Sequence, residues 1–287
     1  MIKIYDMETL EEREILFRGG SGADVSAPVA EILRAVQERG DAALREYTLR
    51  FDGAAPDALA VTAEEVDQAA AQVEPAFLAV LEEAAEHIRA YHARQKRESF
   101  VMTEREGVVL GQRIIPLARV GIYVPGGTAA YPSTVLMNAI PARIAGVGEI
   151  IMVTPPGRDG AVNPHILAAA KIAGVTRIYK VGGAQAVAAL AYGTGTIPQV
   201  DKIVGPGNAY VAEAKRQVFG RVNIDMIAGP SEVLVLADGR SNPAWVAADL
   251  LSQAEHDRMA AAVLVTDSRP LAEAVAHELE RQLAPLP

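Results

Sequence analysis

The amino-acid sequence predicts an α/β protein organised around a mostly parallel β-sheet. The first observation is a series of four apolar segments after residue 119, each followed by Gly or Pro and then by an alanine-rich helical segment. The second is a charged segment with helical periodicity that precedes residue 98. The third is the composition of the 287 residues, 50% hydrophobic and 22% charged, which is typical of a globular protein. A chain of this length suggests about two domains.

The amino-terminal third is expected to be helical, followed by a pair of strands. The clearest helix is predicted over 75–97, where apolar residues recur at spacings of three and four. The residues on this face are Phe77, Val80, Leu81, Ala84, Ala85, Ile88 and Tyr91. The segments FVMTE and VVLGQRIIPL then flank the glycine-containing turn 105–107, which predicts a strand pair.

Four strand-helix units follow, and they carry the prediction of a parallel sheet. Their strands are RVGIYV, EIIMVT, TRIYKV and DKIVG, and their helices are PSTVLMNAIPARIAG, NPHILAAAKIAG, AQAVAALAYG and NAYVAEAKRQVFG. Alternating units of this kind form a mostly parallel sheet with helices on both faces.

Beyond residue 223 the pattern continues with two closely spaced strands, IDMIAG and EVLVLAD. A helix over 242–257, a strand AAAVLVTD and a helix over 270–283 complete the chain. A crossover helix of an α/β protein normally returns the chain to another strand, so the ending at Ala-Pro-Leu-Pro looks abrupt.

Composition excludes several classes of function. The formal net charge is −9 and no basic run occurs, which argues against nucleic acid as a partner. The absence of cysteine excludes disulfides, cysteine–zinc sites and cysteine nucleophiles. The first residues carry charges where a secretory signal needs an apolar core, and the uncharged stretches 120–142 and 181–200 are interrupted by Pro and Gly. We therefore expect a cytoplasmic protein that does not engage a membrane.

Four loops at predicted strand ends are candidates for ligand binding, because ligands of parallel sheets bind at the carboxyl ends of strands. They are Tyr123–Gly127, Gly182–Gln185, Gly205–Asn208 and Ala228–Glu232. Gly205-Pro206-Gly207 comes nearest to a dinucleotide fingerprint, although Tyr210 stands where the third glycine belongs, and Asp225 follows at the spacing of a ribose-binding acid. Tight turns needed only for packing remain the alternative.

The segment Ser252–Asp257 is a second candidate. Gln253 and His256 are three residues apart on a predicted helix, so they share a face and could offer two ligands to a metal. Zinc prefers imidazole, thiolate and carboxylate, which makes this pair a poor zinc signature by itself. The alternative is a solvated helix end whose histidine interacts with the helix dipole. The serine-hydrolase elbow and the P-loop motif are both absent.

Several long motifs together resemble the histidinol dehydrogenase family. They are VGIYVPGG (120–127), YPSTVLMNAIPARIAGV (131–147), GGAQAVAALAYGT (182–194), VDKIVGPGNAYVAEAKRQVFG (200–220) and IDMIAGPSEVLVLADGRSNPAWVAADLLSQAEHD (224–257). They occur in one order across essentially the whole chain, which makes the resemblance more specific than any single loop.

The resemblance implies a homodimeric, zinc-dependent enzyme that oxidises L-histidinol to L-histidine through the aldehyde with two NAD. It implies that Tyr123, Gln185 and Asn208 contact NAD. It also implies that Ser231, Gln253 and His256 contact L-histidinol, with Gln253 and His256 ligating zinc. The lack of cysteine agrees with this chemistry, because the aldehyde cannot then be held as a thiohemiacetal and needs a hydrate and a general base.

One departure concerns the end of the chain. The family continues beyond the position of residue 287, and its catalytic Glu-His pair, an aspartate zinc ligand and a further histidine zinc ligand lie in that continuation. Glu255-His256 belongs to the earlier metal-ligand motif and is not that pair. We therefore expect an amino-terminal portion of the enzyme that is inactive by itself.

The expected organisation has three parts. Residues 1–18 form an arm, residues 119–229 form an incomplete Rossmann-like domain that contacts NAD, and residues 19–118 with 230–287 form the α/β domain into which it is inserted. Two other functions stay open: a non-catalytic protein that keeps nucleotide binding or dimer formation, and another NAD-linked alcohol dehydrogenase.

Overall fold

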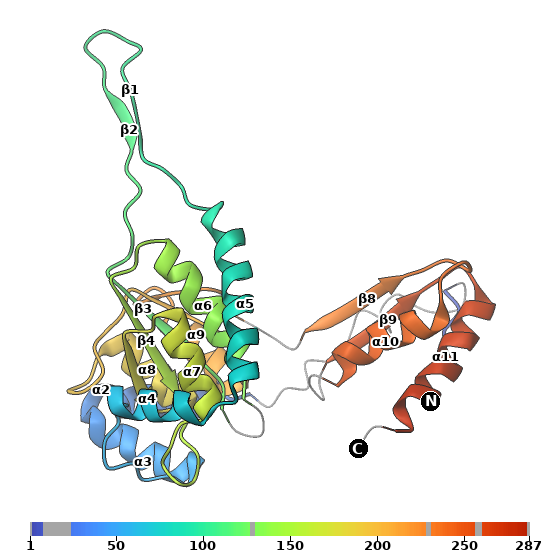
Figure 1. The fold of residues 1–287 in the computed structure, drawn as a ribbon, viewed down its shortest axis with the longest axis horizontal. Coiled ribbons are helices and arrows are strands. Elements are labelled where there is room, and N and C mark those ends of the chain that lie inside the picture. Colours follow the sequence, from blue (N-terminus) through green and yellow to red (C-terminus); the bar gives the residue numbers. More distant parts are fainter. Residues whose placement is uncertain (1, 8–23, 127–129, 228–230, 256–259, 286–287) are drawn as a thin grey trace. The chain divides into compact units, whose positions relative to one another are not determined.

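A computed structural model describes residues 2–7, 24–126, 130–227, 231–255 and 260–285. It divides the chain into two compact units. One unit is Asp24–Ile227, and the other takes Met1–Ala23 and Ala228–Pro287 as far as these residues are described. Figure 1 shows the elements of both units.

The first unit contains a five-stranded parallel sheet of order β5-β4-β3-β6-β7. Its strands are β3 (Arg119–Tyr123), β4 (Glu149–Thr154), β5 (Arg177–Lys180), β6 (Lys202–Val204) and β7 (Asn223–Ile224). The register places Gly121 opposite Ile151 of β4 and Ile203 of β6. The four predicted strand-helix units are confirmed, while β7 ends well before the predicted strand does.

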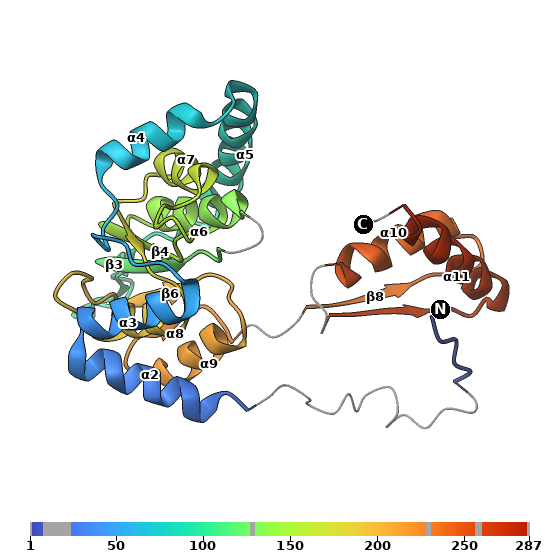
Figure 2. The ribbon, with the colours of Figure 1, turned by 90° about the horizontal axis from the view of Figure 1, so that it is seen from below.

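Helices cover both faces of this sheet, as Figure 2 shows. Four helices lie on one face: α4 (Ala63–Gln72), α5 (Pro75–Ala93), α6 (Pro132–Ile144) and α7 (Pro164–Ala173). Four lie on the other: α2 (Ser26–Arg39), α3 (Asp41–Asp52), α8 (Gly183–Tyr192) and α9 (Ala209–Val218). The amino-terminal helices therefore pack with the sheet in this unit. The predicted discontinuous domain of 19–118 with 230–287 stays a prediction.

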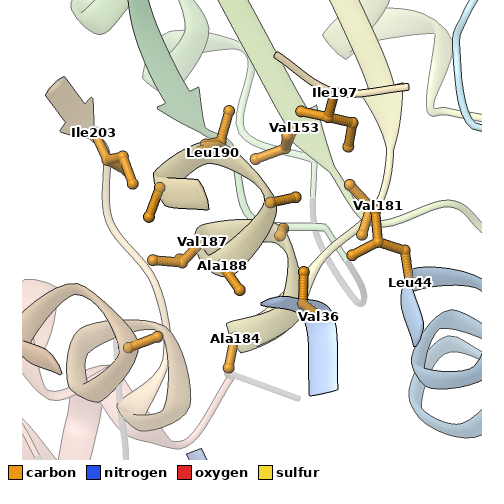
Figure 3. Packing of buried hydrophobic residues seen from close by; sticks show 14 of the residues in the cluster. Val36, Leu44, Val153, Val181, Ala184, Val187, Ala188, Leu190, Ile197 and Ile203 are labelled. Atoms are coloured by element: carbon orange, nitrogen blue, oxygen red, sulfur yellow. The ribbon is translucent and has the colours of Figure 1, made fainter. Parts of the chain in front are cut away.

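The core explains why the strands are continuous apolar runs. Alternate residues of each strand face opposite helix layers, so Ile151 and Val153 join one cluster and Ile150 and Met152 join the other. Helix α8 is buried on nearly every side, and Figure 3 shows its Ala and Val side chains packed between the sheet and α2 and α3. An alanine-rich helix suits this position because small side chains let neighbouring backbones approach closely.

On helix α5 the apolar face predicted from the sequence is wider than the face that is buried in the structure. Leu81 and Ala85 are buried, whereas Val80 and Tyr91 are exposed. At 100° per residue, Val80 and Tyr91 both lie about 90° to the same side of Leu81, at the edge of the apolar stripe. The predicted face is therefore confirmed at its centre and wrong at these two positions.

The predicted strand pair is confirmed as an antiparallel hairpin of β1 (Phe100–Met102) and β2 (Leu110–Gln112). Its residues are exposed, and Figure 1 shows it extending from the first unit, which is named the sheet unit after its five-stranded sheet.

The second unit is a two-stranded parallel sheet with two helices. Its elements are β8 (Glu232–Leu236), α10 (Pro243–Ala254), β9 (Ala261–Val265) and α11 (Arg269–Leu283). The two helices pack on one face of the strands, where Val246, Leu250 and Leu271 form the centre of a small core. The predicted strands and the helix over 270–283 are confirmed, and the helix predicted over 242–257 is confirmed as far as Ala254. Residues 256 and 257 of that prediction lie outside the described residues.

Candidate functional site

The chain reverses its course across the sheet between β3 and β6. From β3 it places β4 and β5 on one side, and it then returns to place β6 and β7 on the other. Strands β3 and β6 are hydrogen-bonded neighbours, with Ile122 opposite Val204. Ligands of open α/β sheets bind outside the carboxyl ends of the strands at such a reversal. The loops after β3 and β6 are therefore the place where a ligand is expected.

Gly205 brings these two loops into contact. Its φ is +113°, in the region that favours glycine, and a Cβ added here would overlap the carbonyl oxygen of Tyr123. The first glycine of the Gly205–Asn208 loop is thus required both by its backbone conformation and by the close approach of the loop after β3. Its role in the fold is steric.

Tyr123, the last residue of β3, lies within the core rather than on an open surface. The Gly183 N–H donates a hydrogen bond of 3.0 Å to its hydroxyl oxygen. Burial raises the pKa of Tyr123 to about 12, the bond from Gly183 lowers it, and the charge of Asp52 adds to the rise. The hydroxyl therefore stays protonated at neutral pH and keeps its own hydrogen to donate.

Gln185 lies in the first turn of α8, two residues after Gly183. Its side chain is 1% exposed, and its Oε1 atom has no hydrogen-bond partner among the described residues. A Cβ at Gly183 would lie 2.6 Å from this oxygen, and the N–H of the same Gly183 donates the hydrogen bond to Tyr123. A buried acceptor without a donor is costly, and a bound ligand that donates a hydrogen bond would relieve this cost.

Asn208 begins α9 as its N-cap. Its Oδ1 accepts hydrogen bonds of 3.1 Å from the N–H groups of Tyr210 and Val211. Capping uses the oxygen and leaves the amide N–H₂ for a ligand, and the residue is exposed. Tyr123, Gln185 and Asn208 therefore lie on the α8 and α9 face of the sheet, at the carboxyl edge.

A cavity of about 610 Å³ opens at the same edge on the other face of the sheet. Glu65 and Gln68 of α4, Pro155 after β4 and Leu167 of α7 contribute to its lining. Pro155 is also the contact through which neighbouring loops pack, because a Cβ at Gly182 would come within 2.6 Å of it. The loops after β4 and β5 are therefore packed closely against each other. The loops after β3 and β6 lie where the strand order reverses.

Asp52 is a charged residue that the sequence did not single out. It ends α3, its Oδ2 is buried without a partner among the described residues, and burial raises its pKa to about 6. The sequence RFDG shows no sign of this, because the burial comes from the packing of α3 on the sheet.

Asp225 has a different environment from that of a ribose-binding acid. Its Oδ2 accepts a 2.8 Å hydrogen bond from the Gly205 N–H, and its Oδ1 forms an ion pair with Lys215. The spacing of 20 residues from Gly205 therefore reflects a contact within the protein.

The residues predicted to bind substrate lie in the second unit. Ser231 directly precedes β8 and is exposed, and Gln253 lies in the last turn of α10. A helix that joins two parallel strands runs antiparallel to them, so its end returns to the edge where β8 begins. Ser231 and Gln253 therefore share the amino edge of β8 and β9, and His256 lies outside the described residues.

Gln253 supplies the test of the predicted metal site. Its Nε2 is buried and has no partner among the described residues. The oxygen and nitrogen of a side-chain amide are distinguished only by their hydrogen bonds, so an unpaired buried amide end fits a ligand role. Within the part of the chain that the structure describes, no three His, Asp or Glu residues gather as a metal site.

Among the same residues no helix is both long and apolar enough to cross a membrane.

The comparisons with known proteins agree on one family. The histidinol dehydrogenase family matches residues 18–287. The chain is 61% identical to the histidinol dehydrogenase of Geobacillus kaustophilus over 259 residues, which are 90% of this chain and 61% of that protein. It is 54% identical to the histidinol dehydrogenase of Listeria monocytogenes serotype 4b, with 98% of this chain and 65% of that protein covered.

A solved structure agrees as well. The crystal structure of histidinol dehydrogenase from Elizabethkingia anophelis superposes with a TM-score of 0.87 at 42% identity, over 92% of this chain and 61% of that one. The chain thus spans less than two thirds of the length of these relatives.

Proposed function

This chain belongs to the histidinol dehydrogenase family, and we propose that its sheet unit binds NAD at the reversal between β3 and β6. The buried, unpaired Oε1 of Gln185 is the observation that carries this proposal. Tyr123 offers a protonated hydroxyl at the Gly183 N–H, and Asn208 offers an amide N–H₂ at the start of α9. The positive ends of α8 and α9 suit the negative pyrophosphate of a dinucleotide.

We propose that the whole protein oxidises L-histidinol to L-histidine through the aldehyde, with two NAD as hydride acceptors. Ser231, Gln253 and His256 would bind the substrate, and Gln253 and His256 would also hold zinc. Zinc, when bound, supplies a Lewis acid that fixes the nitrogen atoms of the substrate. The unpaired amide of Gln253 supports this assignment. A homodimer in the cytoplasm completes the proposal.

The polypeptide of residues 1–287 should bind NAD without turning it over. The resemblance assigns the acid/base residues to positions beyond residue 287, and a general base typically contributes about 10²- to 10⁴-fold in rate. Two zinc ligands alone should also hold the metal weakly, since a stable tetrahedral site has about four.

The decisive experiment compares two lengths in one assay. NADH absorbance is followed with L-histidinol for the 287-residue chain and for the same chain joined to the carboxy-terminal segment of a full-length family member. We expect turnover only in the longer protein, and we expect His256→Ala to abolish it there. Comparable turnover by both lengths would contradict the assignment, and the base would then be sought among Glu232, Glu255 and Asp257.

Two variants test the cofactor residues separately. Gln185→Ala and Asn208→Ala should each weaken NAD binding to the 287-residue chain about tenfold, the effect of losing one hydrogen bond to the ligand. Unchanged NAD affinity in both variants would remove the proposed site from the edge of β3 and β6.

A further inference from the structure

Two charged side chains form hydrogen bonds to the loop that follows β6. Lys215, in the middle of α9, is 2% exposed, and its Nζ donates a 3.0 Å hydrogen bond to the carbonyl oxygen of Gly205. Asp225, just after β7, accepts a 2.8 Å hydrogen bond from the N–H of the same residue. The two side chains also form an ion pair with each other. Both hydrogen-bonding groups of Gly205 are therefore bound by one charged pair.

This arrangement is costly if stability is its only role. Removing a lysine from water carries a large desolvation penalty, and a protein with well-packed apolar side chains in place of a buried ion pair is often as stable or more stable. What the pair provides that apolar side chains cannot is directional bonding to a peptide group. The charges are therefore better explained by the geometry of Gly205 than by the stability of the unit.

The geometry of Gly205 matters because of what lies on either side of it. It contacts the carbonyl of Tyr123, and Asn208 three residues later is fixed by its two bonds to the first turn of α9. The loop is thus anchored at both ends, and only Pro206 and Gly207 lie between the anchors. We therefore expect a change in the Gly205 peptide to shift Asn208 relative to Tyr123.

We propose that Lys215 and Asp225 are positioning residues that set the shape of the Gly205–Asn208 loop for a dinucleotide. The inference rests on the proposed function, because it takes the edge of β3 and β6 as the NAD site. Neither side chain touches the cofactor. They act through the peptide of Gly205, and their loss lowers the affinity for NAD more than it lowers the stability of the fold.

The test measures the dissociation constant of NAD by titration calorimetry on the 287-residue chain, well below the unfolding temperature of every variant. Lys215→Met and Asp225→Asn should each weaken binding about tenfold, the equivalent of about 1.4 kcal/mol. The double variant should bind NAD no more weakly than whichever single variant binds it less tightly, because both residues act through one peptide.

Asp41→Asn is the matched control. Asp41 also holds a loop, accepting bonds from the backbone N–H and the hydroxyl of Thr196 at 3.3 and 2.6 Å, but that loop precedes β6 at the amino edge of the sheet. This variant should lose stability while its NAD affinity stays within about twofold of wild type.

The possible outcomes separate the two proposals. Wild-type affinity in both single variants overturns this inference alone, whereas no NAD binding by the wild-type chain overturns the proposed function and the inference together. Weak binding in Asp225→Asn with normal binding in Lys215→Met would mean that Asp225 contacts the ribose directly, which also overturns the inference. If Lys215→Met does not fold, amide exchange of 205–208 in NAD-free Asp225→Asn decides: faster exchange supports the inference, and unchanged exchange overturns it.

Discussion

The two parallel sheets that the structure describes have similarly apolar strands in different environments. Strands β3 and β4 are apolar runs buried between two layers of helices, and nearly every residue in them is buried. Strand β8 has the equally apolar sequence EVLVL, yet its residues alternate between partly buried and exposed. Leu234 and Leu236 are 64% and 77% exposed. An apolar run thus predicts a strand in both places, but burial on both faces in only one.

The difference shows where stability resides. In the sheet unit the buried apolar residues of the strands contribute to one of two large cores, whereas α10 and α11 protect a single face of β8 and β9. A substitution on the strands of the sheet unit should therefore have a large effect whichever face it lies on. On β8 the effect should depend on the face.

The largest expected effect comes from Ile122→Ala in β3. Ile122 is fully buried, and removing such a side chain typically costs about 2–5 kcal/mol of unfolding free energy. Leu236→Ala on the exposed face of β8 should change the unfolding free energy by less than about 0.5 kcal/mol. Hydrogen exchange resolved by segment measures both values. A cost of about 2 kcal/mol or more for Leu236→Ala would mean that this face is covered, and the contrast between the sheets would fail.

A smaller effect should appear when the pH is changed. Burial raises the pKa of Asp52 to about 6 in the folded sheet unit. The folded state therefore binds a proton that the unfolded state has released, so Asp52 destabilises the unit increasingly as pH rises from about 4 to about 6. Asp52→Asn should be more stable than wild type by about 2 kcal/mol at pH 7 and nearly equal to it at pH 4.

Denaturant unfolding of both proteins at the two pH values checks this prediction. The second unit serves as the internal reference. Its amide hydrogen exchange, measured on the same two proteins, should not depend on the Asp52 substitution. A constant difference between variant and wild type across the pH range would show that the carboxyl is not desolvated.

The smallest effects should come from helix caps, and they test whether the units unfold separately. Thr62 and Glu65 form a capping box at the start of α4, and Ser268 accepts a hydrogen bond from the Leu271 N–H at the start of α11. Thr62→Ala and Ser268→Ala should each cost about 1 kcal/mol. Each loss should appear in the exchange of its own unit only. A loss in the sheet unit caused by Ser268→Ala would contradict the division into two units.

Sequence reasoning was most accurate where local pattern and tertiary environment agree. The run EIIMVT corresponds residue for residue to β4, since a strand buried on both faces needs apolar residues throughout. It was least accurate for α5, where periodicity placed Val80 and Tyr91 on the apolar face although both are exposed among the described residues. Periodicity gives the direction of a stripe, while its width depends on what packs against it.

The candidate site shows the same division. Tyr123, Gln185 and Asn208 could be chosen from sequence because glycine-bearing strand ends and family motifs mark them. The pair of Lys215 and Asp225 could not, because it joins the middle of a helix to the end of a strand. The spacing of Asp225 from Gly205 gave a real signal, but it pointed to a ligand contact where the structure has a contact to the loop itself.

We have proposed that NAD binds at the reversal between β3 and β6 of the sheet unit. Amide hydrogen exchange of the 287-residue chain, with and without saturating NAD, tests this most directly. We expect protection in the segments 121–126, 182–190 and 204–212, with no change in 26–93. Protection confined to the amino-terminal helices, with unchanged exchange at all three strand ends, would contradict it.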